Sequence, residues 1–141
     1  MQQLIEFILR HWELCLAFLA ILGFLLAFEA HIKMCGAASL SPQQAIFLMN
    51  REQAIMLDVR DADSFTKEHI AASVNIPFAE LPQKINQLHS NHEKPIIINN
   101  SQGQAYHQIP RMLKNVGFSK IYHLKGGIIN WRNTGFPLIK K

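Results

Sequence analysis

The sequence predicts an α/β fold, with a parallel sheet covered by helices on both faces, preceded by one N-terminal transmembrane helix. An uninterrupted apolar run covers residues 14–28 near the start of the chain. Two shorter apolar runs, at residues 54–59 and 96–98, have the composition of strands that are buried on both faces, as in parallel sheets. Helix-like segments separate the strand-like ones, and this alternation predicts ligand sites at the carboxyl ends of the strands.

The apolar run is the core of an expected membrane span. As a helix, residues 14–28 would extend only about 22 Å, which is short of a hydrocarbon core of about 30 Å. Residues 12–32 reach the required length, since Trp12 suits the membrane interface and Arg10 and Lys33 can extend their charged ends to the headgroups. We therefore expect a single span at about residues 12–32.

Three other interpretations of this segment are less favourable. A core helix of a soluble domain would not be apolar on every face. A cleaved signal peptide begins with basic residues, whereas the first seven residues carry only Glu6, and Glu29 and Lys33 separate the small residues 36–38 from the apolar run. A lipoprotein site at Cys35 would need small residues before it. We expect a retained anchor, a linker and a soluble domain, at residues 1–34, 35–38 and 39–141.

Charge and cysteine content bear on location and partners. Arg10 and Lys33 flank the span on opposite sides, so the positive-inside rule gives nearly a tie. Cys15 and Cys35 both precede the domain, which excludes a disulfide within it and favours the cytoplasmic side of an inner membrane. The net charge is +4 with scattered basic residues, which argues against nucleic-acid binding and suits an anionic leaflet.

The first part of the domain predicts a short strand, a helix, a central strand and a second helix. Ser41 is a favourable N-cap and Pro42 suits the first helical position. Apolar residues then recur at helical spacing, which predicts one buried face. Asp61 or Asp63 can cap the second, short helix. The expected positions are residues 39–40 for the first strand, 45–49 for the apolar face, 54–59 for the central strand and up to Phe65 for the short helix.

The second part continues the alternation. Pro77 ends a strand expected within residues 68–77, and Pro110 either kinks a later helix or starts its main part. Gly117 ends that helix. The remaining elements are a helix at residues 78–88, a strand at 96–98, the helix at 103–116, a strand at 120–124 and a helix after Gly126-Gly127.

The segment at residues 94–105 is the candidate binding site. Pro95 precedes three Ile residues, and a polar stretch with Gly103 leads into a helical pattern. A strand, a tight loop and a helix N-terminus aim backbone N–H groups at one point, which makes an anion pocket. The loop contains no cysteine that could act as a low-pKa nucleophile. The candidate anion-binding residues are Asn100, Ser101, Gln102, Gly103, Gln104 and Ala105.

Several short motifs occur in a recognisable order over residues 39–138. They are Asp58-Val59-Arg60, Phe65, His69-Ile70, Asn75-Ile76-Pro77, Leu81, Gly103, Gly117-Phe118, Leu124-Lys125-Gly126-Gly127, Trp131 and Gly135-Phe136-Pro137. In this order and spacing the chain resembles the rhodanese-like domain family. The resemblance implies a three-layer domain with a five-stranded parallel sheet. It also implies an active-site loop after the fourth strand that holds a persulfide or an oxyanion with its N–H groups.

The sequence departs from the family pattern at the residues of the active-site loop that carry out the reaction. Sulfurtransferases of this family place a cysteine three residues before the loop glycine, which corresponds to Asn100 when Gly103 is the reference. Gln104 and Ala105 stand where the family has Arg and Ser or Thr. An amide cannot attack sulfane sulfur, so we expect no catalytic residue in this loop. Cys35 precedes the first strand and is expected at the opposite edge of the sheet.

Other polar residues favour structural roles. Asp58 and Arg60 resemble an acid–base pair, but a carboxylate in such a turn more often accepts backbone N–H bonds. His69 falls in a family loop motif. The spacing of His89 and His92 would allow both to bind one metal ion, but the sequence shows no third ligand for it. His107 with Asn100 and Ser101 lacks the carboxylate of a hydrolase triad. We therefore expect no metal and no cofactor.

The sequence thus predicts a membrane-anchored rhodanese-like domain without the catalytic cysteine. Such a domain would be a non-catalytic protein-interaction module with a membrane or membrane-proximal protein partner. Binding of a small anion by the loop at residues 100–105 is a second possibility. The alternative is a sulfurtransferase that moves thiosulfate or persulfide sulfur through a noncanonical thiol or through the thiol of a partner.

Overall fold

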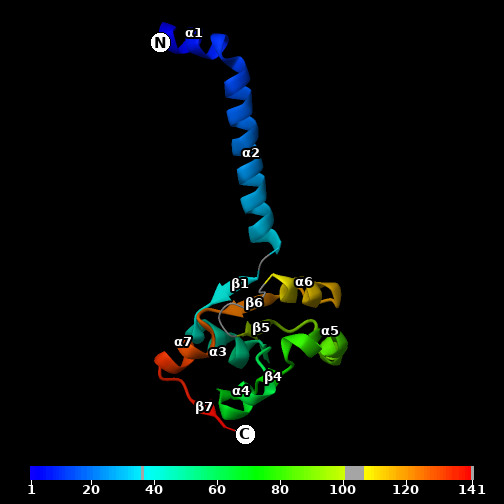
Figure 1. The fold of residues 1–141 in the computed structure, drawn as a ribbon. Helices are drawn as coiled ribbons and strands as arrows, with labels where there is room; N and C mark the ends of the chain where they lie inside the picture. Colours follow the sequence, from blue (N-terminus) through cyan, green and yellow to red (C-terminus); the bar gives the residue numbers. More distant parts are fainter. Residues whose placement is uncertain (36, 101–106, 141) are drawn as a thin grey trace. The chain divides into compact units, whose positions relative to one another are not determined.

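The computed structural model describes residues 1–35, 37–100 and 107–140. The chain divides into two compact units, Met1–Cys35 and Gly36–Lys141 (Figure 1). Each unit is described by itself.

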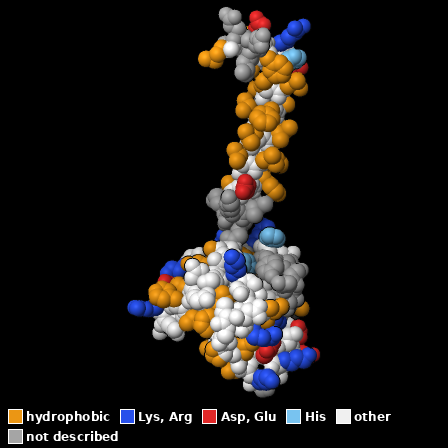
Figure 2. Space-filling view, turned by 90° about the vertical axis from the view of Figure 1, so that its left-hand side faces the viewer, with side chains coloured by type: hydrophobic (Ala, Val, Ile, Leu, Met, Phe, Trp, Pro, Cys, Tyr) orange, Lys and Arg blue, Asp and Glu red, His pale blue; other side chains and the backbone are white. Residues whose placement is uncertain are grey.

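The first unit consists of two helices. Helix α1 (Gln2–Arg10) and helix α2 (Trp12–Cys35) meet at His11, whose φ of −127° breaks the helical path. By length and composition, the segment Trp12–Ala30 is a candidate membrane span, although a signal sequence has the same properties. Hydrophobic side chains cover most of α2 in the view of Figure 2. The expected apolar helix is therefore present, and it continues through Cys35.

A five-stranded sheet forms the centre of the second unit. All neighbouring strands are parallel, in the order β1-β6-β5-β2-β4. The strands are β1 (Ala38–Leu40), β2 (Ile55–Asp58), β4 (Val74–Asn75), β5 (Ile96–Asn99) and β6 (Ile121–Leu124). The prediction of an α/β domain with a five-stranded parallel sheet is confirmed.

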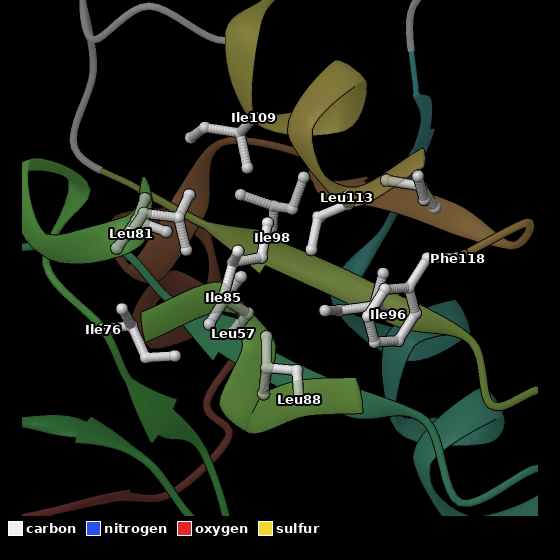
Figure 3. Close-up of a cluster of buried hydrophobic side chains, with 12 residues drawn as sticks. Leu57, Ile76, Leu81, Ile85, Leu88, Ile96, Ile98, Ile109, Leu113 and Phe118 are labelled. Atoms are coloured by element: carbon white, nitrogen blue, oxygen red, sulfur yellow. The ribbon is translucent and has the colours of Figure 1, made fainter. Parts of the chain in front are cut away.

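Helices cover both faces of the sheet because each central strand is apolar on both sides. In β5, Ile96 and Ile98 face one hydrophobic cluster and Ile97 faces the other. The first cluster includes Leu113 and Phe118 (Figure 3). It packs under α5 (Leu81–Lys84), η2 (Ile85–Asn91) and α6 (Gln108–Asn115), and the second packs under α3 (Pro42–Arg51) and α7 (Gly127–Asn133).

The helix ends follow the predicted capping residues. Ser41 caps α3 through a hydrogen bond from Gln44 N, and the Gln44 side chain accepts in return from Ser41 N. Asp61, not Asp63, caps α4 (Ala62–Lys67) by accepting from Ser64 N at 2.9 Å. Helix α6 ends before Gly117, which has a φ of +105°. These contacts satisfy N–H and C=O groups that have no partner inside the helix.

Two parts of the chain differ from the prediction. The helix expected at residues 78–88 is wrong as a single helix, because η1 (Phe78–Glu80), α5 and η2 follow one another there. Pro82 has no N–H to donate to Phe78 O, so an α-helix cannot run unbroken through it. The strand expected within residues 68–77 is two strands, of which β3 (His69–Ile70) pairs antiparallel with β7 (Leu138–Ile139) in a separate small sheet.

Pro110 resolves the open question about the helix expected at residues 103–116. It is the third residue of α6, in the first turn, where a missing N–H costs no hydrogen bond. The main helix therefore starts near Pro110 and is not kinked by it. The expected start at residues 103–106 lies outside the described residues.

Candidate functional site

Polar side chains gather at the carboxyl ends of three neighbouring strands. Asp58 ends β2 and lies level with Asn99 at the end of β5 and with Asn75 at the end of β4. Arg60 and Asn100 directly follow these strands and are each only 5% exposed. We call Asp58, Arg60, Asn75, Asn99 and Asn100 the strand-end cluster. Register alone brings them together, since parallel strands end at the same edge of the sheet.

A buried ion pair is the centre of the cluster. The Arg60 guanidinium donates through Nε to Asp58 Oδ1 at 3.0 Å and through Nη2 to Asp58 Oδ2 at 2.7 Å. Asp58 is fully buried. Arg60 N also donates to Asp58 Oδ1 at 3.0 Å, which fits the structural role predicted for this carboxylate. Arg60 Nη2 donates further to Glu68 O at 2.9 Å, so the pair fixes the start of β3 as well.

Two asparagine amides complete the hydrogen bonding around the ion pair. Asn99 Nδ2 donates to Asp58 Oδ2 at 3.0 Å. Asn75 Nδ2 donates to Asp58 O at 3.1 Å and to Arg60 O at 3.0 Å. The carboxylate therefore accepts from a guanidinium, a backbone N–H and an amide, so its buried oxygens all have hydrogen-bond donors.

Asn100 and Asn99 each keep one buried polar atom that has no hydrogen-bond partner among the residues the structure describes. These atoms are Asn100 Nδ2 and Asn99 Oδ1. Gly127, at the start of α7, packs directly against this position, because a Cβ built there would lie 2.8 Å from Asn100 O and 3.4 Å from Asn99 Oδ1. A buried amide donor that stays unpaired is costly, which makes Asn100 Nδ2 a candidate contact for water or a ligand.

The other predicted site residues are distributed differently. Ser101, Gln102, Gly103, Gln104 and Ala105 lie outside the described residues. His69 is buried, bonds through Nδ1 to Phe65 O at 2.9 Å and stacks on the Phe65 ring. His107 is exposed and directly precedes α6. No group of three or more potential metal ligands occurs in the described ranges 1–35, 37–100 and 107–140.

Sequence reasoning did not find two members of this site. The sequence places Asn99 in the strand–loop segment and Gly127 in a turn, and it indicates neither the contact of Asn99 with Asp58 nor the approach of Gly127 to Asn100. The signal for Asn99 is its position, a polar residue that ends a buried apolar strand. The signal for Gly127 is weaker, since its close approach to Asn100 depends on how α7 packs against β5.

His123 in β6 is a second ionisable group on this half of the sheet. Burial lowers the pKa of the His123 imidazole from its ordinary value, and the positive charge of His107 lowers it further. The neighbouring strand residue is Ile98, so His123 lies in the layer that α6 covers. The neutral imidazole is the form that the folded domain favours.

We expect the folded domain to lose stability as the pH falls below about 6.5, because the unfolded chain then binds a proton that folded His123 resists. The contribution of His123 is complete above the unfolded pKa and is lost as the pH falls towards the lower folded pKa. Replacement by Gln (His123→Gln) should flatten the pH dependence of the unfolding free energy measured with urea, and His107→Gln should flatten it less. Full retention of the wild-type slope in His123→Gln would contradict the assignment.

An apolar groove lies beside the edge strand β1, away from the cluster. It has a volume of about 380 Å³ and is lined by Leu40, Gln43, Gln44, Phe47, Leu48 and Tyr122. Phe47 is 58% exposed. The Arg51 guanidinium lies 5.7 Å from the centre of the Phe47 ring. The groove is therefore an exposed apolar surface with a basic residue at its side.

The fold and the strand-end cluster define an α/β domain whose site lies at the carboxyl edge of a parallel sheet. The family model described as Rhodanese-like domain matches residues 41–134. This chain belongs to the rhodanese-like domain family, which confirms the resemblance seen in the sequence.

Particular relatives show which proteins the chain is similar to. It is 28% identical over 141 residues to the uncharacterized protein YibN of Escherichia coli, with 99% of each chain covered. It is 34% identical over 93 residues to the thiosulfate sulfurtransferase GlpE of Stutzerimonas stutzeri, covering 66% of this chain and 83% of that one. A thiosulfate sulfurtransferase structure from Pseudomonas aeruginosa superposes with a TM-score of 0.63 at 26% identity, covering 74% of this chain and 20% of that one.

Proposed function

We propose that this chain is a membrane-anchored rhodanese-like domain that lacks the catalytic cysteine of the family's sulfurtransferases and acts as a non-catalytic binding module. The observation that carries the proposal is Asn100, which directly follows β5 in the strand-end cluster. An amide can neither attack sulfane sulfur nor carry it as a persulfide. The two cysteines of the sequence, Cys15 and Cys35, both precede β1.

The position of Cys35 argues against its replacing the missing nucleophile. Strand β1 begins at Ala38, at the amino edge of a sheet whose five strands are all parallel. The strand-end cluster lies at the opposite, carboxyl edge. Cys15 belongs to the candidate membrane span. We therefore expect neither thiol to replace the missing nucleophile.

A protein partner at or near the membrane is the ligand we favour. The groove beside β1 offers exposed apolar surface of the kind that binds protein side chains. Arg60 is already engaged by Asp58 and Glu68 O, so the described part of the site presents no unused cation to an anion. Anion binding would depend on the backbone of residues 101–105. The absence of a disulfide in the domain supports a cytoplasmic position.

The named activity of the relatives supports one alternative. Proteins called thiosulfate sulfurtransferase match the domain at about one third identity or less. In this alternative the chain binds a sulfur donor at the strand-end cluster, and a noncanonical thiol or the thiol of a partner protein receives the sulfur. The proposed binding module and the alternative sulfurtransferase differ in whether the chain takes part in sulfur uptake.

Restoring the nucleophile tests the proposal directly. We expect the purified full-length chain to take up no sulfur from thiosulfate and Asn100→Cys to become one sulfur atom heavier by mass spectrometry. The reason is that Asn100 occupies a buried strand-end position whose supporting hydrogen bonds are intact. Cys35→Ser and Cys15→Ala in the Asn100→Cys chain are the matched controls, and the gained mass should survive both.

The outcomes separate the two functions. Sulfur uptake by the parent chain would contradict the proposal, and its loss on Cys35→Ser would assign the reaction to Cys35. A silent parent that takes up sulfur only when a thiol-containing partner protein is added would support the alternative. Uptake by Asn100→Cys alone would mean that only the nucleophile is missing from a preserved site.

A further inference from the structure

The corner between α1 and α2 has an apolar inner side. A groove of about 460 Å³ lies there, within the first unit. Phe7 and Ile8 of α1 form one wall, and all the residues that line it are apolar. The other wall comes from α2 and consists of Leu14, Cys15, Phe18 and Leu19. The apolar surface of α2 therefore continues without interruption onto one face of α1.

A second hollow, of about 430 Å³, is lined by Glu6, Phe7, Arg10 and His11. Phe7 borders both hollows. Glu6 and Arg10 are the only charged side chains of α1, and they line only the second one. Helix α1 thus keeps its charges outside the apolar groove. Such segregation is the pattern of helices that lie in the plane of a membrane interface.

The bend between α1 and α2 is held by specific contacts at His11. His11 N donates to Phe7 O at 3.0 Å, and the His11 ring packs against the Phe7 ring at a centroid distance of 4.9 Å. Leu14 N then donates to His11 O at 3.0 Å, which starts α2. The chain therefore changes direction at a defined residue, as Figure 1 shows for α1 and α2.

The length of the candidate span determines the depth at which the bend at His11 would lie in a membrane. The segment Trp12–Ala30 has 19 residues. At about 1.5 Å per residue it is roughly 28 Å long, which matches a hydrocarbon core of about 30 Å. If α2 fills that core, His11 and α1 lie at the headgroup level, where Trp12 is also favourable.

We propose that α1 lies flat in the membrane interface, with its Phe7 and Ile8 side against the lipid acyl chains and with Glu6 and Arg10 directed to water. The inference rests on the membrane anchoring in the proposed function. Lipid is the occupant of the groove because the walls of the groove continue the apolar surface of α2, and Glu6 and Arg10 line only the other hollow. The in-plane helix holds the N-terminal end of the span at the interface.

Site-directed spin labelling of the full-length chain tests this arrangement. Single cysteines that carry a nitroxide are placed at Ile8, Arg10 and Leu22 in a Cys15→Ala, Cys35→Ser chain, reconstituted in vesicles of phosphatidylcholine and phosphatidylglycerol. Access of oxygen and of a water-soluble nickel chelate is measured by power saturation. The ratio of oxygen to nickel access should be several-fold higher at Ile8 than at Arg10 and should approach the value at Leu22.

A second variant tests the same face without a large change in the helix. With the label at Ile8, Phe7→Asp should raise nickel access several-fold because it puts a charge on the apolar side. The matched change Glu6→Gln, on the polar side, should leave that access nearly unchanged. An equal response to both substitutions would overturn the proposed orientation.

Each remaining outcome has a distinct meaning. Equal nickel access at Ile8 and Arg10 with a protected Leu22 would overturn the in-plane helix while leaving the anchor in place. High nickel access at all three positions would show that the anchoring itself is wrong. A third result is a label at Ile8 that is protected from both reagents and shows spin–spin broadening that grows with the protein-to-lipid ratio. That result would identify a second copy of the chain as the occupant of the groove and would overturn the assignment of lipid.

Discussion

Arg60→Met should destabilise the domain by about 3–5 kcal/mol, the cost of leaving a buried charge without its partner. Asp58 is fully buried and receives three side-chain hydrogen bonds from the Arg60 guanidinium, at 3.0, 3.1 and 2.7 Å. Loss of Arg60 also removes a donor to Glu68 O. The measurement is the unfolding free energy of the full-length chain in detergent, followed in urea by the near-ultraviolet circular dichroism of the aromatic side chains.

The exposed pair between Glu80 and Lys84 is the matched control. Both side chains are about half exposed and lie one helical turn apart. Lys84→Met should therefore change the unfolding free energy by less than about 1 kcal/mol. The double substitution Asp58→Leu, Arg60→Met should destabilise less than Arg60→Met alone, because no charge is left buried. A similar small effect for Arg60→Met and Lys84→Met would contradict the role assigned to the buried pair.

Gly127→Ala should destabilise the second unit more than Gly135→Ala does. Gly127 has a φ of +58°, which costs an L-residue about 1–2 kcal/mol, and its added Cβ would lie 2.8 Å from Asn100 O. The backbone of Asn100 or of α7 must therefore move. Gly135 is the control, because its φ of +80° carries the same conformational cost while nothing lies within 4 Å of its added Cβ.

The difference between the two alanine variants isolates the close approach at the strand-end cluster. Gly135→Ala should lower the thermal unfolding midpoint by only the conformational cost. Gly127→Ala should lower it clearly further, by about another 1–3 kcal/mol in unfolding free energy, as overpacking does in well-packed interiors. Amide exchange at Asn100 should also rise in Gly127→Ala and not in Gly135→Ala. Equal midpoints for the two variants would mean that Asn100 has room to move.

The sequence predicts the sheet well because apolar runs report burial directly. Residues 96–98 are three Ile residues, and the structure buries all of them, on alternate faces of β5. The caps at Ser41 and Asp61 are equally local, since each depends on residues three positions away. The apolar spacing at residues 78–88 predicts one helix, but Pro82 lacks the N–H that an unbroken helix needs, so the structure has three short helices there.

The site was predicted less completely for a physical reason. Asp58 and Arg60 are two residues apart, so their pairing is visible in a short motif. The bond between Asn99 and Asp58 joins residues 41 positions apart and exists only because β2 and β5 pair in one particular register. Register depends on the packing of the whole sheet. No local pattern contains that information.

The strand order has a consequence for the order of events during synthesis. Among the described residues, β1 pairs only with β6, which is the last strand of the five-stranded sheet to be made. Strand β1 is therefore the first strand of the sheet to leave the ribosome and waits longest for its neighbour. Helix α2 is made before any of these strands, so the anchoring proposed for it would begin while the domain is still unfolded.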